Sequence, residues 1–223
     1  MSKVIKMTLD ELKTHCLSCT ECELCKARTQ VVFGVGNPAA DILLIGEGPG
    51  ENEDLQGQPF VGRSGKLLDQ FLESIDLSRE KNVYIANMVK CRPPKNRDPK
   101  PEEQEACLHW LREQFKIIRP RLVICVGRIA AQRLIDKDFR VTRQHGEWFN
   151  KDGVWYMGTF HPAALLRNPH IARNEEMQLY PLEDRKNLHD QYLGHLTDVV
   201  MVGYTSLAAE RLGGADYDGD MIK

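Results

Sequence analysis

The sequence has no long apolar run, no large excess of charge of one sign and no apolar leader. No stretch approaches the roughly 20 apolar residues that a membrane-spanning helix needs, so we expect no membrane partner. The 30 Lys and Arg against 32 Asp and Glu leave a net charge of −2, which excludes a global attraction to nucleic acid and confines any basic footprint to one segment. The first ten residues lack the apolar core of a signal peptide, which predicts a cytoplasmic protein.

Cysteine is the residue type present in unusual number. There are seven cysteines, and disulfides are rare in the cytoplasm, so these thiols point to a metal or a cluster. Four of them stand within ten residues, each separated from the next by two residues: Cys16, Cys19, Cys22 and Cys25. Cys91 and Cys107 lie in mid-chain, and Cys125 stands in a buried strand pattern that indicates a small core residue.

The cysteine spacing leaves two sets of ligands open. A local set would use the four N-terminal cysteines, which are close to a ferredoxin-like run but lack its terminal proline. A distributed set would combine Cys19 and Cys22 with Cys91 and Cys107 and leave the other two N-terminal cysteines as free thiols. Both sets give four thiolates, which suit either a [4Fe-4S] cluster or a structural zinc ion.

Short apolar runs alternate with helical patterns along the chain. Buried strands are predicted over three ranges and a hairpin over a fourth: 41–46, 83–89, 121–127 and 146–159. Helices are predicted over five ranges: 8–15, 65–76, 101–118, 128–136 and 181–195. This repetition predicts an α/β fold with three layers, α/β/α, around a central, mostly parallel, four-stranded sheet. We assign residues 1–199 to this domain and residues 200–223, with the acidic run 216–220, to a C-terminal tail of unknown role.

The segment 46–65 follows the first predicted strand and is rich in glycine and carboxylates. We expect a ligand-binding loop there, because open α/β sheets bind ligands beyond the carboxyl ends of their parallel strands. Its acidity argues against a phosphate cradle, and Pro49 removes a backbone donor that such a cradle would use. An aromatic ring at Phe60 is more than a plain connector needs.

Three polar side chains are predicted to converge at this edge of the sheet. Glu47, Asn87 and His161 each lie at or just beyond the carboxyl end of a different strand, so they should form a single active site. A carboxylate, an amide and an imidazole beside an aromatic ring suit the recognition and attack of a planar, hydrogen-bonding ligand. For His161 the alternative is a structural hydrogen bond.

Two further segments near these strand ends suit contact with DNA. The run 90–100 carries five cations against one acid and is stiffened by prolines, so it is either a solvated face or a set of phosphate contacts. Leu165, Leu166 and Arg167 follow His161, and two apolar residues with a cation suit a wedge into stacked bases. This wedge favours a functional histidine over a purely structural one.

Four segments carry a resemblance to a known family: Gly46-Glu-Gly-Pro-Gly50, Pro59-Phe-Val-Gly62, Asn87-Met-Val-Lys-Cys-Arg-Pro-Pro94 and His161-Pro-Ala-Ala-Leu-Leu-Arg-Asn-Pro169. Together they resemble the family 4 uracil-DNA glycosylases, the iron–sulfur-containing branch of that superfamily. The match runs from about Cys16 to Pro169 in the family's order. The resemblance implies the uracil-DNA glycosylase fold and a base excision repair enzyme that hydrolyses the N-glycosidic bond of deoxyuridine to leave an abasic site.

The resemblance also implies catalytic roles. Glu47 would position or deprotonate the attacking water, with Glu51 and Glu53 as weaker candidates. His161 would stabilise the negative charge that develops at O2 of uracil. No lysine nucleophile is implied, so we expect a monofunctional enzyme that does not cleave the strand.

Binding roles follow from the same resemblance. Phe60 would stack on the flipped base, Asn87 would pair with N3–H and O4 of uracil, and Gly48 would line the same pocket. DNA contacts are implied for six residues: Arg92, Lys95, Arg97, Leu165, Leu166 and Arg167.

The family pattern selects the distributed cysteine set, with Cys19, Cys22, Cys91 and Cys107 holding a structural [4Fe-4S] cluster. It implies uracil-containing DNA as the partner and a monomer as the state of the protein. The alternative is a catalytically inactive DNA-binding or polymerase-associated protein on the same fold, but the catalytic carboxylate, the asparagine and the histidine are all present. The basic segment lacks the histidine of the covalently trapping relatives, which favours an ordinary hydrolase.

Overall fold

The computed structural model describes residues 7–167, which form a mixed sheet of six strands in the order β1-β3-β2-β4-β6-β5. The strands are β1 Val35–Gly36, β2 Ile42–Gly46, β3 Val83–Asn87, β4 Leu122–Val126, β5 Trp148–Lys151 and β6 Val154–Thr159. The four central strands are parallel, whereas β1 and β5 pair antiparallel at the two edges. The predicted α/β class is confirmed, but the strand count of four is wrong. It omitted the two-residue β1, which is too short to show a period, and it did not count the first arm of the predicted hairpin, β5, as a strand of the sheet.

The helices of the described residues are α1 Leu9–Leu17, α2 Glu51–Gln56, α3 Arg63–Glu73, α4 Pro101–Ile118, α5 Arg128–Leu134, α6 Val141–Gln144 and α7 Pro162–Arg167. Two 3-10 turns lie outside these helices: Glu23–Lys26 between α1 and β1, and Pro94–Asn96 between β3 and α4. The segment 46–65 therefore contains the short helix α2 and is not a continuous loop. The predicted helix 181–195 and the tail 200–223 lie outside the described residues.

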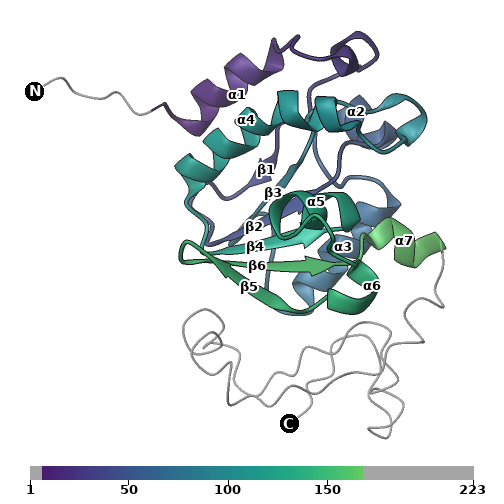
Figure 1. The fold of residues 1–223 in the computed structure, drawn as a ribbon. Coiled ribbons are helices and arrows are strands. Elements are labelled where there is room, and N and C mark those ends of the chain that lie inside the picture. Colours follow the sequence, from purple (N-terminus) through teal and green to yellow (C-terminus); the bar gives the residue numbers. More distant parts are fainter. Residues whose placement is uncertain (1–6, 168–223) are drawn as a thin grey trace, which may run out of the picture.

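Side chains of the central strands alternate between two apolar cores. Leu43 and Ile45 of β2 pack with α4 and α5 on one face, whereas Ile42 and Leu44 pack with α3 on the other. Figure 1 shows the resulting three layers. Because both faces are covered, the β2 run is apolar throughout rather than alternating. None of the described helices is long and apolar enough to cross a membrane.

A third apolar cluster joins the N-terminal segment to α4. Leu12 and Cys16 of α1 and Leu24 pack there with Cys107 and Trp110 of α4. In Figure 1, α1 lies beside α4 at the top of the molecule. The N-terminal cysteines are thereby brought next to the cysteines of mid-chain.

The central strands end level with one another. Gly46 of β2 pairs with Asn87 of β3, and Val126 of β4 pairs with Thr159 of β6. Because parallel strands share one carboxyl edge, the residues that follow them meet there. Glu47, Asn87 and His161 accordingly lie along this edge of the sheet.

Candidate active site and cysteine cavity

Gly46 lets two side chains approach the end of β2 closely. A Cβ atom on Gly46 would lie 2.4 Å from Oδ1 of Asn87 and 2.8 Å from Cζ of Phe60. Any side chain at this position would displace the amide or the ring, so glycine is needed here. The side chains of Asn87, the last residue of β3, and of Phe60 thus both lie against the end of β2.

Asn87 carries an unused hydrogen-bond acceptor. The residue is 2% exposed, and among the described residues its Oδ1 is the one buried side-chain oxygen or nitrogen without a hydrogen-bond partner. Leaving such a group unpaired costs about 1–3 kcal/mol, so native structures rarely keep one without a function. The acceptor is therefore available for a donor on a ligand.

Phe60 is held in an unusual backbone conformation. Its φ of 53° lies in the left-handed region, and its carbonyl accepts from Nη2 of Arg79 at 2.9 Å. Arg79 also donates to the carbonyl of Pro59 and pairs with Asp69. On the other side, a Cβ on Gly65 would lie 2.0 Å from the Phe60 carbonyl oxygen. Arg79 thus holds the backbone of Phe60, a contact that sequence reasoning missed because Arg79 is nineteen positions away and belongs to no motif.

His161 stacks on Phe60 and is uncharged at neutral pH. The two ring centroids are 5.4 Å apart with an interplanar angle of 24°. Burial lowers the pKa of His161 to about 4, and Arg167 adds to the effect. Nδ1 of the imidazole accepts from the backbone N–H of Ala163 at 3.1 Å, which places the proton of the neutral ring on Nε2. His161 therefore offers one neutral N–H donor.

Glu47 is half-buried and has the proton affinity of a general base. Burial raises the pKa of Glu47 to about 7, and Asp98 adds to the rise, whereas Arg128 and Arg167 oppose it. A base works best when its pKa lies near the operating pH. The catalytic role predicted for Glu47 stays a prediction.

The two weaker candidates have other contacts. Glu53 holds the loop together, because Oε1 accepts from the backbone of Val61 and Gly62 and Oε2 accepts from Gly50. Glu51 is exposed and lies 3.5 Å from Arg92. Of the three carboxylates, Glu47 has the environment that suits a base.

One cavity is lined by five of the seven cysteines: Cys19, Cys22, Cys25, Cys91 and Cys107. All four members of the distributed set are among them. Cys16 is fully buried and does not line the cavity, so the local set, which needs it, does not surround one space. Cys125 is also fully buried, in the core, as predicted.

The cavity surrounds its thiols with N–H donors. Arg28 Nη1 donates to Cys91 Sγ at 3.2 Å, Trp110 Nε1 donates to Cys19 Sγ at 3.3 Å, and the backbone N–H of residue 90 donates to Cys107 Sγ at 3.2 Å. Hydrogen bonds of this kind stabilise thiolates that hold iron–sulfur clusters. Between residues 7 and 167, no three Cys, His, Asp or Glu side chains are placed to hold a single metal ion. Five thiols line the one cavity.

Comparison with known proteins decides the family. The model of a family described as the uracil DNA glycosylase superfamily matches residues 33–183. The chain belongs to this superfamily. Three similar proteins are each named type-4 uracil-DNA glycosylase. The protein of Archaeoglobus fulgidus is 45% identical over 179 residues, which are 76% of this chain and 88% of the relative.

The other two relatives come from different organisms. The protein of Thermotoga maritima is 46% identical over 170 residues, which are 74% of this chain and 85% of the relative. The protein of Sulfurisphaera tokodaii is 40% identical over 174 residues, which are 74% of this chain and 79% of the relative. The resemblance to family 4 glycosylases drawn from the four segments is confirmed.

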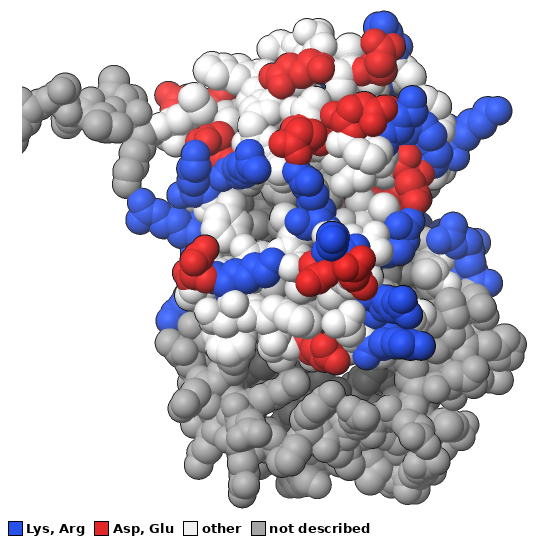
Figure 2. All heavy atoms as spheres, viewed as in Figure 1, with Lys and Arg blue, Asp and Glu red and all other residues white. Residues whose placement is uncertain are grey.

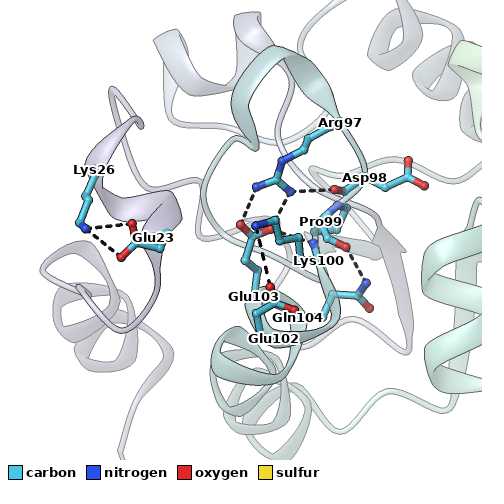
Figure 3. Close-up of polar contacts among 9 residues, drawn as sticks. All are labelled: Glu23, Lys26, Arg97, Asp98, Pro99, Lys100, Glu102, Glu103 and Gln104. Atoms are coloured by element: carbon cyan, nitrogen blue, oxygen red, sulfur yellow. Dashed lines mark hydrogen bonds and ion pairs between the residues drawn. The ribbon is translucent and has the colours of Figure 1, made fainter.

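The basic segment of this superfamily member is partly used for its own structure. Arg97 forms two hydrogen bonds with the carboxylate of Glu103, at 2.6 and 2.8 Å, and Glu103 also accepts from the backbone N–H of Lys100 (Figure 3). These contacts fix the start of α4. Arg92 donates to Asn96 at 2.7 Å. A role for Arg97 at DNA stays a prediction, and it would require the guanidinium to be shared with Glu103.

Arg128 was not singled out in the sequence. It follows Gly127, where a Cβ would lie 3.2 Å from the Cβ of His161, and it pairs with Asp98 at 2.5 Å. Together with Arg167 it acts electrostatically on Glu47. Figure 2 shows cations and acids interspersed over one face of this superfamily member, so basic character is local rather than global. The sequence did hold a signal for Arg128. The residue directly follows the strand predicted over 121–127 and so lies at the carboxyl edge of the sheet.

The wedge residues lie on α7. Leu166 is 39% exposed, Leu165 is half-buried and Arg167 is exposed. They lie in the second half of α7, the helix that begins directly after His161. The predicted roles of these residues on DNA stay predictions.

Proposed function

We propose that this protein removes uracil from DNA by hydrolysing its N-glycosidic bond and leaves an abasic site. The similar proteins are named type-4 uracil-DNA glycosylases, and this chain matches most of their length. The observation that carries the proposal for this chain is the unpaired, buried Oδ1 of Asn87 beside the ring of Phe60. An acceptor next to a flat apolar surface suits a base edge that presents an N–H donor.

Uracil would satisfy the amide of Asn87, and cytosine would not. The N3–H of uracil would donate to Oδ1 of Asn87, and the amide N–H of the same side chain would donate to O4. Cytosine presents an acceptor and a donor at these two positions, so both pairs would fail and leave buried groups unpaired. Such a mismatch gives discrimination on the order of 10⁴. Phe60 would stack on the base, and Gly46 and Gly48 would leave room for it.

The base must leave the stack before this contact can form, because its C1′ bond is inaccessible inside a duplex. Leu165 and Leu166 would fill the space that the base vacates, with Arg167 on a phosphate. Arg92 and Lys95 would contact further phosphates, and their contribution would weaken as salt rises.

Bond cleavage places positive charge on the sugar and negative charge on uracil. The neutral His161 would donate its Nε2–H to O2, where the negative charge gathers, and this support costs no proton transfer. Glu47 would orient the water and take its proton, and its negative charge would also stabilise the cationic sugar. These assignments depend on burial at this edge of the sheet, which lowers the pKa of His161 and raises the pKa of Glu47.

The cysteine cavity fits a [4Fe-4S] cluster held by Cys19, Cys22, Cys91 and Cys107. A single zinc ion would draw its four thiolates to about 2.3 Å from one point, whereas a cluster of four irons holds them around a larger space. The four thiols of the set line one cavity, which supports a shared site for them. When bound, the cluster would supply a structural link between the N-terminal segment, the basic segment and α4.

Two serine variants test the ligand set. Cys91→Ser should lose the cluster, seen as loss of iron and of the broad absorbance near roughly 400 nm expected of thiolate-ligated iron. Cys25→Ser, which alters a residue of the same cavity outside the set, should keep both. Iron per chain, measured on protein purified without oxygen, decides the question. Equal iron in the two variants would remove Cys91 from the set.

Arg128 should contribute one phosphate contact. Arg128→Gln should weaken binding to uracil-containing DNA and reduce the slope of log affinity against log salt by about one. Arg133→Gln is the matched control, because Arg133 lies on the same helix and also pairs with a carboxylate, that of Glu105. Fluorescence anisotropy at several salt concentrations gives both slopes. An unchanged slope for Arg128→Gln would exclude the contact.

The function itself is tested with four oligonucleotides that differ in one base, uracil, cytosine, thymine or adenine. After incubation with protein that retains its cluster, alkali should break the strand containing uracil and leave the other three intact. Without alkali no strand should break, because the mechanism includes no lysine nucleophile. Intact uracil strands after alkali would contradict the proposal.

A further inference from the structure

Lys90 is a buried lysine that the proposed reaction does not use. It is 1% exposed, and its ammonium donates to the backbone carbonyl of Asn87 at 2.9 Å and to Oε1 of Gln114 at 2.7 Å. Both partners are neutral. Burying a charge is costly unless an opposite charge compensates it, so the position of Lys90 needs an explanation.

No carboxylate supplies the compensating charge within the described part of the chain. None of the ion pairs between residues 7 and 167 includes Lys90. The groups that act electrostatically on its ammonium are three cysteines: Cys107, Cys16 and Cys91. Lys90 also lines the cysteine cavity, and its backbone N–H donates to Cys107 Sγ at 3.2 Å. Two of these three thiols, Cys107 and Cys91, line the cavity and would be thiolates when they hold a cluster.

The ammonium of Lys90 is also hydrogen-bonded to the end of β3 that carries Asn87. The Asn87 carbonyl lies three residues before Lys90, at the strand end that places the Asn87 amide beside Phe60. Gln114 of α4 is fully buried, and its Nε2 donates to the carbonyl of Phe33 at 2.9 Å. The chain of contacts therefore runs from the Phe33 carbonyl through Gln114 and Lys90 to Asn87, with no mobile surface group in it.

We propose that Lys90 is a positioning residue that couples the cysteine cavity to base recognition. Its ammonium offsets the net negative charge that four thiolates leave on the cluster site, and in the same position it holds the Asn87 carbonyl. Loss of the thiolates would leave the ammonium uncompensated and loosen the end of β3. The kinetic half of the inference, an effect of Lys90 on KM, rests on the proposed function. The other half, an effect of Lys90 on the retention of iron, rests on the cysteine cavity alone.

Lys90→Met tests both halves, because methionine keeps the apolar length and removes the charge and the donor. We expect the variant to release iron to a chelator about tenfold faster than the unmodified protein. In the iron-loaded fraction we expect KM for a uracil oligonucleotide to rise about tenfold, with kcat changed less than threefold. The carbonyl of Asn87 would lose its donor, so the base would be held less well while the chemistry persists.

Lys26→Met is the matched control, since Lys26 is an exposed lysine that follows Cys25 and pairs with Glu23 on the surface. It should release iron at the rate of the unmodified protein and keep its KM. Equal iron release and equal KM in Lys90→Met and the unmodified protein would overturn the coupling. So would a variant that only melts at lower temperature, because that is the signature of a lysine with a purely structural role.

Gln114→Glu separates the charge from the hydrogen bond and remains informative if Lys90→Met does not fold. The glutamate adds a negative charge beside the ammonium and loses the donor to the Phe33 carbonyl, but it leaves the Lys90–Asn87 bond in place. Iron release should become faster, while KM of the iron-loaded fraction stays within about threefold. Unchanged iron release would overturn the charge half of the proposal. An unmodified protein that is inactive on uracil would contradict the proposed function instead, and the iron measurements would still decide the role of Lys90.

Discussion

Asn87→Asp should lower the preference for uracil over cytosine from on the order of 10⁴ to near unity. Aspartate keeps the size of asparagine but has no N–H to donate to O4 of uracil. Its carboxylate would repel that oxygen and accept from the amino group of cytosine instead. The measurement is the ratio of kcat/KM on two oligonucleotides that differ only in this base.

A second asparagine provides the control for this experiment. Asn150 lies in β5, where it pairs with Trp155 near the start of β6, at the opposite end of β6 from His161, and its Oδ1 accepts from the backbone N–H of Gly153. Asn150→Asp should leave the ratio unchanged. If Asn87→Asp also kept the selectivity of the unmodified protein, Asn87 would have no part in reading the base.

Glu47→Gln should lower kcat by about 10²–10⁴-fold, because glutamine cannot take a proton from water and carries no charge to face the cationic sugar. In the unmodified protein, burial and Asp98 raise the pKa of Glu47 to about 7. Activity should therefore fall about tenfold for each pH unit below 7 and level off above it. The pKa of His161, at about 4, lies below this window and should add no second limb there.

The pH profile also identifies which carboxylate acts. Glu51→Gln should keep the limb near pH 7, since Glu51 is an exposed residue beside Arg92. Asp98→Asn should move the limb to lower pH, because Asp98 is the second cause of the raised pKa of Glu47. A limb that persists in Glu47→Gln would assign the titration to another group.

Stability should respond to Glu47 in the opposite direction from activity. The folded protein binds the Glu47 proton more tightly than the unfolded chain does, because the pKa rises from 4.5 to about 7 on folding. Stability from this group is therefore present below pH 4.5 and lost as pH rises through 7. Glu47→Gln should melt at a higher temperature than the unmodified protein at pH 8 and at nearly the same temperature at pH 4. Thermal melts at the two pH values check this sign.

The convergence of the site was predictable because it depends on topology. Parallel strands share a carboxyl edge, so Glu47, Asn87 and His161 had to meet once the strands were placed. The distributed cysteines could be selected from the resemblance, and the cavity brings together all four. Spacing alone could not choose between the two sets, because both supply four thiolates.

Features that depend on contacts between distant residues escaped sequence reasoning. The helix α2, Glu51–Gln56, has no apolar period, and its one buried side chain, Asp54, accepts from the backbone of Thr29 and Gln30. Arg97 lies in a run of cations, and only the structure shows that the carboxylate of Glu103 engages it. In each case polar contacts of a carboxylate decide the local structure, and such contacts leave no periodic signal in the sequence.

The burial of Lys90 is the clearest example. A lysine in the run Lys90-Cys-Arg-Pro-Pro-Lys95 reads as one more solvated cation, yet its side chain points inward to Gln114 and the carbonyl of Asn87. The structure thus divides this basic segment into a buried lysine, a paired arginine at Arg97 and an exposed lysine at Lys95. Composition alone assigns all three to the surface.

The most direct test is a crystal structure of the protein soaked with free uracil. The predicted result is a base stacked on Phe60 whose N3 lies within hydrogen-bond distance of Oδ1 of Asn87, with O2 facing Nε2 of His161. That structure would give the buried acceptor its partner. Uracil bound elsewhere, or bound in the pocket with Oδ1 of Asn87 still unpaired, would contradict the reading of the base by Asn87.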